Sequence, residues 1–233
     1  MRPPEDRGPG GKDRRRFFWL LSGLFLALYL CWPVRDYLAG KYWEMTIPRL
    51  LSGRDLNGNG VSDTGDIIAG ARKVVAAKPR YRSVYYKDDA YPPPSEGVCT
   101  DLVWRAFQNA GYDLKSLIDA DIRAHTYAYP RVAGRPDPAI DFRRVPNQKV
   151  FFSRHGLNLS TDIIPGDPES LAQWQPGDIV TFKDPDHVVI LSPRRNARGL
   201  PYLIHHSNPY PREADDFMSR YPRITGHYRF PKD

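Results

Sequence analysis

Cysteine and histidine are the two residue types in this chain that could together attack a carbonyl group. Cys99 stands in the segment EGVCTD (96–101), where the pattern predicts the start of a helix, and His187 stands at the start of the apolar run DHVVIL (186–191). A thiol attacks a carbonyl as its thiolate, and both a helix N-terminus and a neighbouring imidazole lower the pKa of a thiol. The pattern therefore predicts Cys99 as a nucleophile and His187 as its base.

Such a pair needs a third polar group that orients the imidazole through its second nitrogen. His205 ends the next apolar run, and adjacent strands would place it beside His187. His206 would point to the opposite face, because side chains alternate along a strand, and Asn208 lies in the following loop. We therefore predict a Cys99–His187–His205 triad. The alternative interpretation is structural. A cysteine at a helix start is more often a small buried residue, and a histidine at a strand start is more often a hydrogen-bonded edge residue.

The N-terminus carries an apolar run, FFWLLSGLFLALYLCWPV (17–34), of 18 residues without a charge. This length is at the short end of what spans a bilayer. Three arginines precede it, so the positive-inside rule places residues 1–16, a disordered tail, in the cytoplasm and the chain after Arg35 outside. We predict a single-pass signal anchor over residues 17–34, with a cleaved signal peptide or a lipoprotein signal as alternatives.

The anchor separates the two thiols of the chain, because Cys31 lies within the apolar run and Cys99 lies outside the membrane. No intrachain disulfide can form between them. A lone exported thiol is a liability to oxidation, so its presence suggests that the thiol itself is used.

The composition limits the partners of the chain. It has 233 residues and a net charge of +7 at pH 7. About 200 residues follow the apolar run, enough for one catalytic domain. A basic exported domain suits an anionic partner such as a cell wall or a membrane surface. Arginine and lysine are not interleaved with aromatic residues in a nucleic-acid-binding pattern, so nucleic acid is not expected. Nothing in the composition indicates an oligomeric state.

The periodicity predicts an α+β domain. Apolar residues at helical spacing indicate helices over 66–77 and 100–110, with Gly111 as the C-cap of the second. Frequent Pro and Gly over 112–170 predict loops and short helices. From residue 174 the pattern is that of an antiparallel sheet, with strands over 179–182, 187–191, 202–205 and 224–230. We expect a juxtamembrane segment over 35–79 and a catalytic domain over 80–233.

The order of these features, a helix headed by Cys99, a Pro-Gly-Asp turn, His187 and a second histidine, resembles the NlpC-type cell-wall cysteine peptidases, which have a papain-like fold. From about Tyr81 to Pro231 the chain is more closely similar to the bacterial uncharacterised-domain family 1287 (DUF1287). The segments that carry this similarity are GVCTDLVWRAFQNAGYDL (97–114), PDPAIDFRRVPNQKVFF (136–152), WQPGDIVTF (174–182), DHVVIL (186–191), IHH (204–206) and GHYRF (226–230).

The resemblance implies roles for particular residues. Cys99 would be the nucleophile, His187 the base and His205 the orienting residue. The backbone N–H of the cysteine would form an oxyanion site with an upstream tyrosine, for which Tyr86 and Tyr91 are the candidates. The sequence departs from the family pattern at one point, because the family's histidine in the third strand is commonly followed by Asn, and here a second histidine follows it.

Two further features remain open between functional and structural interpretations. Arg143 and Arg144 could bind a carboxylate of a peptide substrate, or belong to a structural Arg–Asp network under a long loop. Arg229 allows the same two interpretations.

An aspartate-rich loop precedes the first expected helix. Oxygen-bearing side chains stand at positions 1, 3, 5, 9 and 12 with Gly60 at position 6, a spacing typical of calcium loops: Asp55, Asn57, Asn59, Asp63 and Asp66. The alternative is a turn that caps the helix. Any calcium would be structural, and no cofactor is expected for catalysis.

Together these features predict an anchored cysteine hydrolase, a peptidase or amidase, that faces the periplasm or exterior of a bacterial cell. Its expected substrate is an amide bond in peptidoglycan peptides. An acyltransferase that uses the same thiolate is one alternative, and a non-enzymatic envelope-binding protein on the same fold is another.

Overall fold

The computed structural model describes residues 32–50, 52–87 and 90–232. Its centre is a six-stranded sheet in which all neighbouring strands are antiparallel, in the order β3-β8-β4-β5-β6-β7. This confirms the expected α+β class and antiparallel sheet. The strands are β3 (Leu157–Asn158), β4 (Ile179–Phe182), β5 (His187–Arg195), β6 (Pro201–His206), β7 (Pro211–Ala214) and β8 (Ile224–Arg229), and a separate parallel pair is formed by β1 (Arg80–Tyr81) and β2 (Glu96–Gly97).

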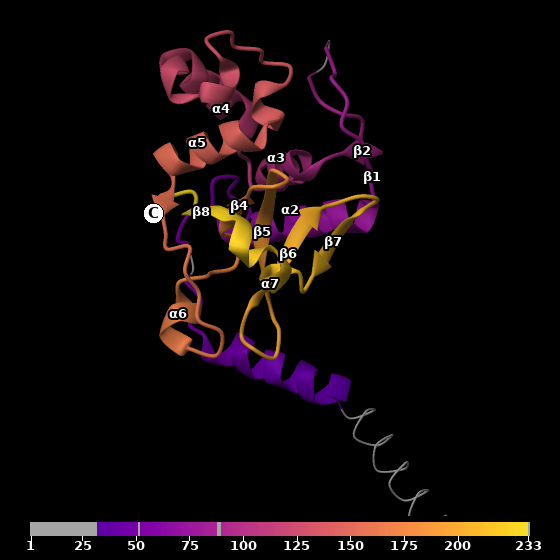
Figure 1. The fold of residues 1–233 in the computed structure, drawn as a ribbon, viewed down its shortest axis with the longest axis vertical. Coiled ribbons are helices and arrows are strands. Elements are labelled where there is room, and N and C mark those ends of the chain that lie inside the picture. Colours follow the sequence, from indigo (N-terminus) through magenta and orange to yellow (C-terminus); the bar gives the residue numbers. More distant parts are fainter. Residues whose placement is uncertain (1–31, 51, 88–89, 233) are drawn as a thin grey trace, which may run out of the picture.

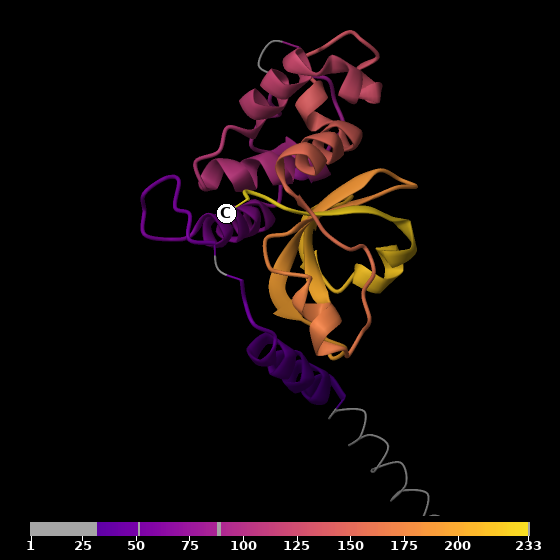
Figure 2. The same cartoon turned by 90° about the vertical axis from the view of Figure 1, so that its left-hand side faces the viewer.

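Helices cover both faces of the sheet. On one face α2 (Asp63–Ala77) and α3 (Cys99–Asn109) pack against each other and against β5 and β6. The helices α4 (Leu114–Ala124) and α5 (Val145–His155) extend this layer beyond one end of the sheet (Figures 1 and 2). The other face carries the short helices α6 (Pro168–Ala172) and α7 (Phe217–Arg220). The described residues also form four 3-10 turns: η1 (Thr126–Ala128), η2 (Pro130–Val132), η3 (Asp141–Arg143) and η4 (Tyr221–Arg223).

The alternation of side chains along β5 divides the core into two clusters. Val188 and Ile190 join the cluster under α2 and α3, whereas Val189 and Leu191 join the cluster around Trp174 on the opposite face. A strand that is buried on both faces has a continuous apolar sequence, which is why this run lacks polar residues. The placement of β5 between two helical layers fixes the position of the histidine at its start.

Helix α2 belongs to this folded domain. Ile67 and Ala71 are 1% and 0% exposed and lie in the same core cluster as the residues of α3. The expected domain start at residue 80 would separate α2 from its packing partner. The structure corrects that boundary, because the apolar face of α2 is buried against α3 and β6.

The segment 112–170 is more regular than its Pro and Gly content predicts. Helices α4 and α5 contain 11 residues each. Pro146 stands in the first turn of α5, where a missing backbone N–H leaves no hydrogen bond unmade. Pro at that position therefore begins a helix, and its presence was a poor reason to expect only loops and short helices.

Residues 32–46 form a helix across the end of the domain opposite α4 and α5 (Figure 1). Trp43 holds this helix to the domain, since its Nε1 donates a hydrogen bond of 3.2 Å to the carbonyl oxygen of Ala197. Within residues 32–50, 52–87 and 90–232, no helix is long and apolar enough to cross a membrane. All but the last three residues of the expected anchor over 17–34 lie outside the described residues.

Candidate active site

Cys99 is the first residue of α3, as the sequence predicts, and its side chain is 5% exposed. The helix start is fixed by a one-way cap, in which the N–H of Val98 donates to Oδ2 of Asp101 over 2.8 Å. The Sγ atom of Cys99 accepts a hydrogen bond from the backbone N–H of Val188. The nucleophile candidate therefore lies directly against the start of β5.

Burial raises the pKa of the Cys99 thiol to about 11, and the neighbouring carboxylate of Asp101 acts in the same direction. Hydrogen bonds from the backbone N–H groups of Val188, Thr100 and Cys99 itself favour the thiolate, but they do not outweigh the loss of solvation. This corrects the expectation that the helix N-terminus makes Cys99 acidic. The resting residue is a neutral thiol.

His187, His205 and Asp216 form a hydrogen-bonded chain beside this thiol. Nε2 of His187 lies 2.8 Å from Nδ1 of His205, and Nε2 of His205 lies 3.2 Å from Oδ2 of Asp216. Ser207 Oγ lies 2.9 Å from the same Nδ1 of His205. The structure thus brings together the two histidines that strand alternation predicts, and it adds a carboxylate.

The chain of contacts assigns the protons on both rings. Asp216 is a carboxylate acceptor, so the Nε2 of His205 carries a proton and its Nδ1 is an acceptor. That acceptor receives the N–H at Nε2 of His187. The remaining nitrogen of His187, Nδ1, therefore holds a lone pair, which is the form that a general base requires.

Burial also keeps both imidazoles neutral. It lowers the pKa of His205 to about 3 and the pKa of His187 further still, and the positive charges of Arg220 and Arg212 add to both shifts. Neither the thiol nor His187 is charged at rest, and among the described residues no hydrogen bond joins the thiol to either imidazole.

Arg220 stands beside the histidine pair with much of its hydrogen-bonding capacity unused. Its Nη2 lies 3.4 Å from Oγ of Ser207 and 4.0 Å from the carboxylate of Asp216. Its Nε is buried and has no hydrogen-bond partner among the described residues. The charge of the Cys99 thiolate would also stabilise this guanidinium. Arg220 is the residue near the site that is most able to accept a further anionic group.

Tyr81, which the sequence did not single out, is a tyrosine on which the charge of Cys99 acts. Pairing of β1 with β2 sets Tyr81 opposite Gly97, two residues before Cys99. Burial raises the pKa of Tyr81, and the charges of Cys99 and Asp101 raise it further. Its ring contacts that of His206 edge to face at 5.4 Å between centroids.

The two tyrosines expected from the sequence lie elsewhere. The hydroxyl of Tyr86 donates to Glu96 over 2.6 Å, and burial together with this bond raises its pKa to about 12. The ring of Tyr91 packs on Trp104 and Phe142. Among the described residues no hydrogen bond or ring contact joins either tyrosine to Cys99, whereas the charge of Cys99 acts on Tyr81, so we prefer Tyr81 as the oxyanion candidate.

Arg143 and Arg144 form the structural network that the sequence left as one of two possibilities. The guanidinium of Arg143, whose side chain is 2% exposed, makes a two-point contact with Asp101 through bonds of 2.8 and 3.0 Å. Arg144 donates to Asp141 over 2.7 Å. Arg143 thus holds the carboxylate that caps α3. Its burial corrects the expectation that it could bind a substrate.

Arg229 is also structural. Its Nε and Nη2 donate to the two carboxylate oxygens of Asp178 over 2.7 and 2.8 Å. The same carboxylate accepts a hydrogen bond of 2.9 Å from Nε2 of His227, whose ring stacks on Trp174 at 3.9 Å between centroids. This buried cluster joins β8 to the turn before β4.

His206 faces away from the histidine pair, as alternation predicts. It is fully buried, and neither ring nitrogen has a hydrogen-bond partner among the described residues. Burial lowers its pKa to about 4, although the charge of Asp101 and the nearby backbone carbonyl groups of Pro79 and Val98, which lie outside good hydrogen-bond geometry, act in the opposite direction. An unpartnered buried imidazole is costly in its charged form, which bears on the stability of the domain at low pH.

The aspartate-rich loop is organised by internal hydrogen bonds. The carboxylate of Asp55 accepts from the N–H groups of Asn59 and Gly60 over 3.1 and 2.7 Å. The side-chain amides of Asn57 and Asn59 both donate to Oδ2 of Asp66, over 2.7 and 2.8 Å. Donor groups therefore point to the carboxylate at position 12, where a calcium loop has a metal ligand.

Asp63, the remaining acidic residue of the loop, is the first residue of α2 and is 1% exposed. It accepts hydrogen bonds from the N–H of Leu56 over 2.7 Å and from the hydroxyl of Tyr112. No group of three or more His, Cys, Asp or Glu side chains in the described part of the chain could hold a metal ion. The geometry is that of the helix-capping turn.

Comparisons with known proteins identify the family of the chain. The family model described as "Domain of unknown function (DUF1287)" matches residues 68–230, and the chain belongs to this family. It is also 33% identical over 173 residues to the uncharacterised protein YijF of Escherichia coli (strain K12), across 70% of this chain and 80% of that protein. No solved structure matches the chain significantly.

Proposed function

We propose that this protein is a cysteine hydrolase, a peptidase or amidase of papain-like, NlpC-type fold, that cleaves an amide bond in peptidoglycan peptides. One observation carries the proposal. The chain from Asp216 through His205 to His187 leaves Nδ1 of His187 as an acceptor, at the strand start against which Sγ of Cys99 lies. His187 directly precedes the backbone N–H that favours the thiolate of Cys99, and a neutral thiol with an oriented neutral imidazole is the proposed starting pair for nucleophilic catalysis.

The first step forms an acyl-enzyme. The thiol proton of Cys99 passes to Nδ1 of His187 as the sulfur–carbon bond forms and the carbonyl π electrons move to oxygen, so an imidazolium and an oxyanion arise together. Burial penalises each charge alone, but the two charges attract each other strongly in a site with little water. Asp216 and His205 stabilise the imidazolium through the hydrogen bond at Nε2.

The carbonyl oxygen becomes an oxyanion during this step. The backbone N–H of Cys99 at the start of α3 and the hydroxyl of Tyr81 are the donors proposed to receive it. The imidazolium of His187 then gives its proton to the leaving amine, and the carbon–nitrogen bond breaks. Water, deprotonated by the same nitrogen, releases the acyl group and restores the thiol.

The choice of peptidoglycan peptides rests on the resemblance to cell-wall peptidases and on the expected anchor. The anchor would place the domain in the periplasm or outside the cell, bound to the membrane through its N-terminal helix. Peptidoglycan stem peptides carry free carboxylates, and the unused donor groups of Arg220 beside the site suit such a substrate. No cofactor is needed for this chemistry.

The test is digestion of purified muropeptides with the full-length protein, with products identified by mass. We expect one new amine and one new carboxylic acid per cleaved bond, and no products with Cys99→Ser. A thioester that passes its acyl group to an added amine but not to water would identify an acyltransferase. If the parent binds muropeptides without turnover and Cys99→Ser binds them equally well, the protein is an envelope-binding protein and the proposal fails.

A reporter tests the location. A C-terminal fusion that is active only in the cytoplasm should be silent, because residues 35–233 are proposed to lie outside. Activity of that fusion would overturn the proposed orientation.

A further inference from the structure

The helix over residues 32–46 exposes an unusual number of large apolar side chains. Val34, Leu38, Tyr42 and Met45 recur at helical spacing on its surface and are 58%, 59%, 59% and 86% exposed. One face of a helix carries residues at this spacing. A row of exposed apolar side chains of this kind marks a surface that contacts another protein or a membrane.

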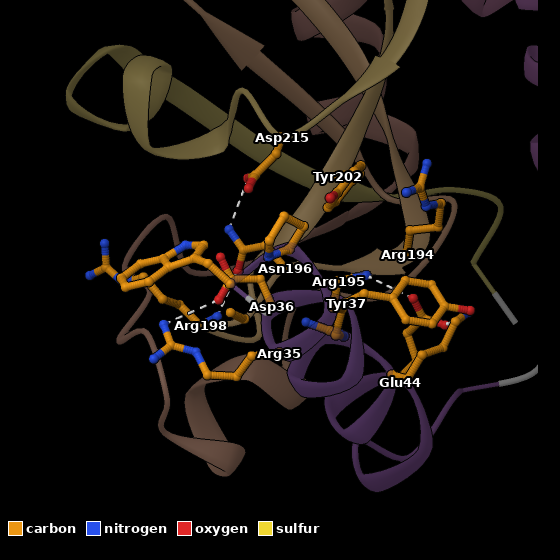
Figure 3. Close-up of a pocket in the computed structure, with 14 residues that line it drawn as sticks. Arg35, Asp36, Tyr37, Glu44, Arg194, Arg195, Asn196, Arg198, Tyr202 and Asp215 are labelled. Atoms are coloured by element: carbon orange, nitrogen blue, oxygen red, sulfur yellow. Dashed lines mark hydrogen bonds and ion pairs between the residues drawn. The ribbon is translucent and has the colours of Figure 1, made fainter. Parts of the chain in front are cut away.

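A cavity of about 740 Å³ lies between this helix and the hairpin that joins β5 to β6. Figure 3 shows side chains of the helix and of the hairpin around it. Its cationic side chains come from both elements and include Arg35, Arg194 and Arg198, and the aromatic residues Trp32 and Tyr202 also line it.

The acidic residues of this cavity have partners of their own. Glu44 accepts from Nζ of Lys41 over 2.6 Å and from the backbone N–H of Arg195 over 3.3 Å. Asp215 accepts from the side-chain amide of Asn196 over 2.8 Å (Figure 3). Asp36 pairs with the adjacent Arg35 at 3.4 Å, and the Arg35 side chain is exposed whereas that of Asp36 is partly exposed.

Two arginines of the hairpin have no carboxylate partner among the described residues. The guanidinium of Arg194 lies 4.4 Å from the ring centroid of Tyr202, and that of Arg198 makes no hydrogen bond or ion pair with any residue that the structure describes. The guanidinium of Arg35 stacks on Trp32 at 4.1 Å. Guanidinium groups bind phosphate through two parallel N–H donors, and stacking on an aromatic ring leaves those donors free.

We propose that the helix over residues 32–46 lies on the membrane surface and that the arginine-lined cavity beside it binds the phosphate group of an anionic phospholipid. An apolar row next to a cationic cavity matches a lipid, which carries acyl chains and phosphate in one molecule. A soluble anionic polymer would leave the apolar row in water. The site is independent of Cys99 and goes beyond the proposed hydrolase.

The position along the chain supports a lipid as the occupant. The cavity is lined from Trp32 onward, at the end of the apolar run over 17–34, and Arg35 is the first charged residue after that run. Aromatic and basic residues that directly follow a membrane-spanning run lie at the level of the lipid headgroups.

The experiment uses the full-length protein in a neutral detergent and measures binding by titration calorimetry. The probes are dihexanoyl-phosphatidylglycerol, dihexanoyl-phosphatidylcholine and inorganic phosphate. The test variant is Arg194→Gln/Arg198→Gln, whose two positions are exposed. The control is Arg131→Gln/Arg135→Gln, which removes the same charge from exposed positions in the lobe of α4 and α5.

We expect the parent to bind phosphatidylglycerol more tightly than phosphatidylcholine, with affinity that falls as salt rises. The test variant should lose about tenfold or more of that affinity, since each basic residue near an anionic lipid contributes substantially. The control should bind as the parent does. Any one of four results would overturn the proposal. The parent could bind both lipids equally well, or bind inorganic phosphate as tightly as phosphatidylglycerol. The test variant could bind as the parent does, or the control could be weakened as much as the test variant. Muropeptide digestion by the test variant should be unchanged, which separates this result from the proposed function.

Discussion

Nε2 of His187 lies 2.8 Å from Nδ1 of His205, across the neighbouring strands β5 and β6. Because Asp216 fixes the tautomer of His205, this contact also fixes the tautomer of His187. The catalytic competence of the proposed base therefore depends on a carboxylate that does not touch it.

The first prediction concerns Asp216 as a positioning residue. Asp216→Asn removes the charge that fixes the tautomer and stabilises the imidazolium, so kcat on muropeptides should fall by at least about tenfold. The acidic limb of the pH–rate profile should also shift, because the negative charge of Asp216 raises the pKa of both histidines. The matched control is Glu169→Gln, an exposed position on α6. A fall in kcat without any change of the pH profile would leave Asp216 a purely structural residue.

The second prediction concerns the reactivity of Cys99. Burial raises its thiol pKa to about 11, so alkylation by iodoacetamide should be slow at pH 7 and should accelerate steadily up to about pH 10. His187→Ala should remove turnover but leave this profile nearly unchanged, since the resting pair is neutral. The measurement is labelling rate against pH by intact mass. A plateau of reactivity below pH 8 would show a preformed thiolate and contradict the resting state described here.

Much of this site could be predicted from the sequence because it depends on local periodicity. A cysteine before an amphipathic helix and a histidine before an apolar run set Cys99 and His187 at element starts, and alternation separates His205 from His206. These features need no knowledge of how distant segments pack. The helix began at Cys99 and the strand at His187, as the patterns indicate.

Tyr81 and Asp216 were missed because long-range pairing places them. Tyr81 reaches the site through two two-residue parallel strands, which have no sequence signature of their own. Asp216 is the N-cap of the four-residue helix α7. An Asp before an apolar residue is a recognisable helix start, but so short a helix gives no periodic signal to accompany it. The pKa of Cys99 was misjudged because burial is a tertiary property.

The third prediction concerns Arg220 and the substrate. If its unpaired donors bind a substrate carboxylate, Arg220→Gln should raise KM for muropeptides by about tenfold, the usual loss for a hydrogen bond to a charged group. Amidation of that carboxylate in the substrate should raise KM for the parent but not for the variant. The control is Arg135→Gln, which replaces an exposed arginine in the lobe of α4 and α5. An equal effect of amidation on both proteins would exclude Arg220 as the binding residue.

The fourth prediction concerns calcium. The loop from Asp55 to Asp66 is held by its own N–H donors, so the melting temperature should be the same with calcium and with a chelator. Asp55→Ala should lower the melting temperature equally in both conditions, because it removes the acceptor for two backbone N–H groups. A calcium-dependent rise in melting temperature that disappears in Asp55→Ala would restore the calcium-loop interpretation.

The fifth prediction concerns acid stability. Burial lowers the pKa of His206 to about 4 and of His205 to about 3, against about 6.5 in an unfolded chain. Between about pH 6.5 and 4 the unfolded chain therefore binds more protons than the folded one, and the free energy of unfolding falls as pH falls. Each such histidine contributes up to about 1.4 kcal/mol per pH unit in that range.

His206→Leu isolates one of these contributions, because the ring has no hydrogen-bond partner among the described residues and lies outside the proposed catalytic chain. The variant should digest muropeptides as the parent does. Urea unfolding at pH 7, 6 and 5 should show a smaller loss of stability on acidification than in the parent. At pH 7 its stability should be equal or greater, since replacing an unpartnered buried polar group with an apolar one of similar size removes a desolvation cost. The same acid slope in both proteins would show that His206 finds a proton acceptor in the folded state.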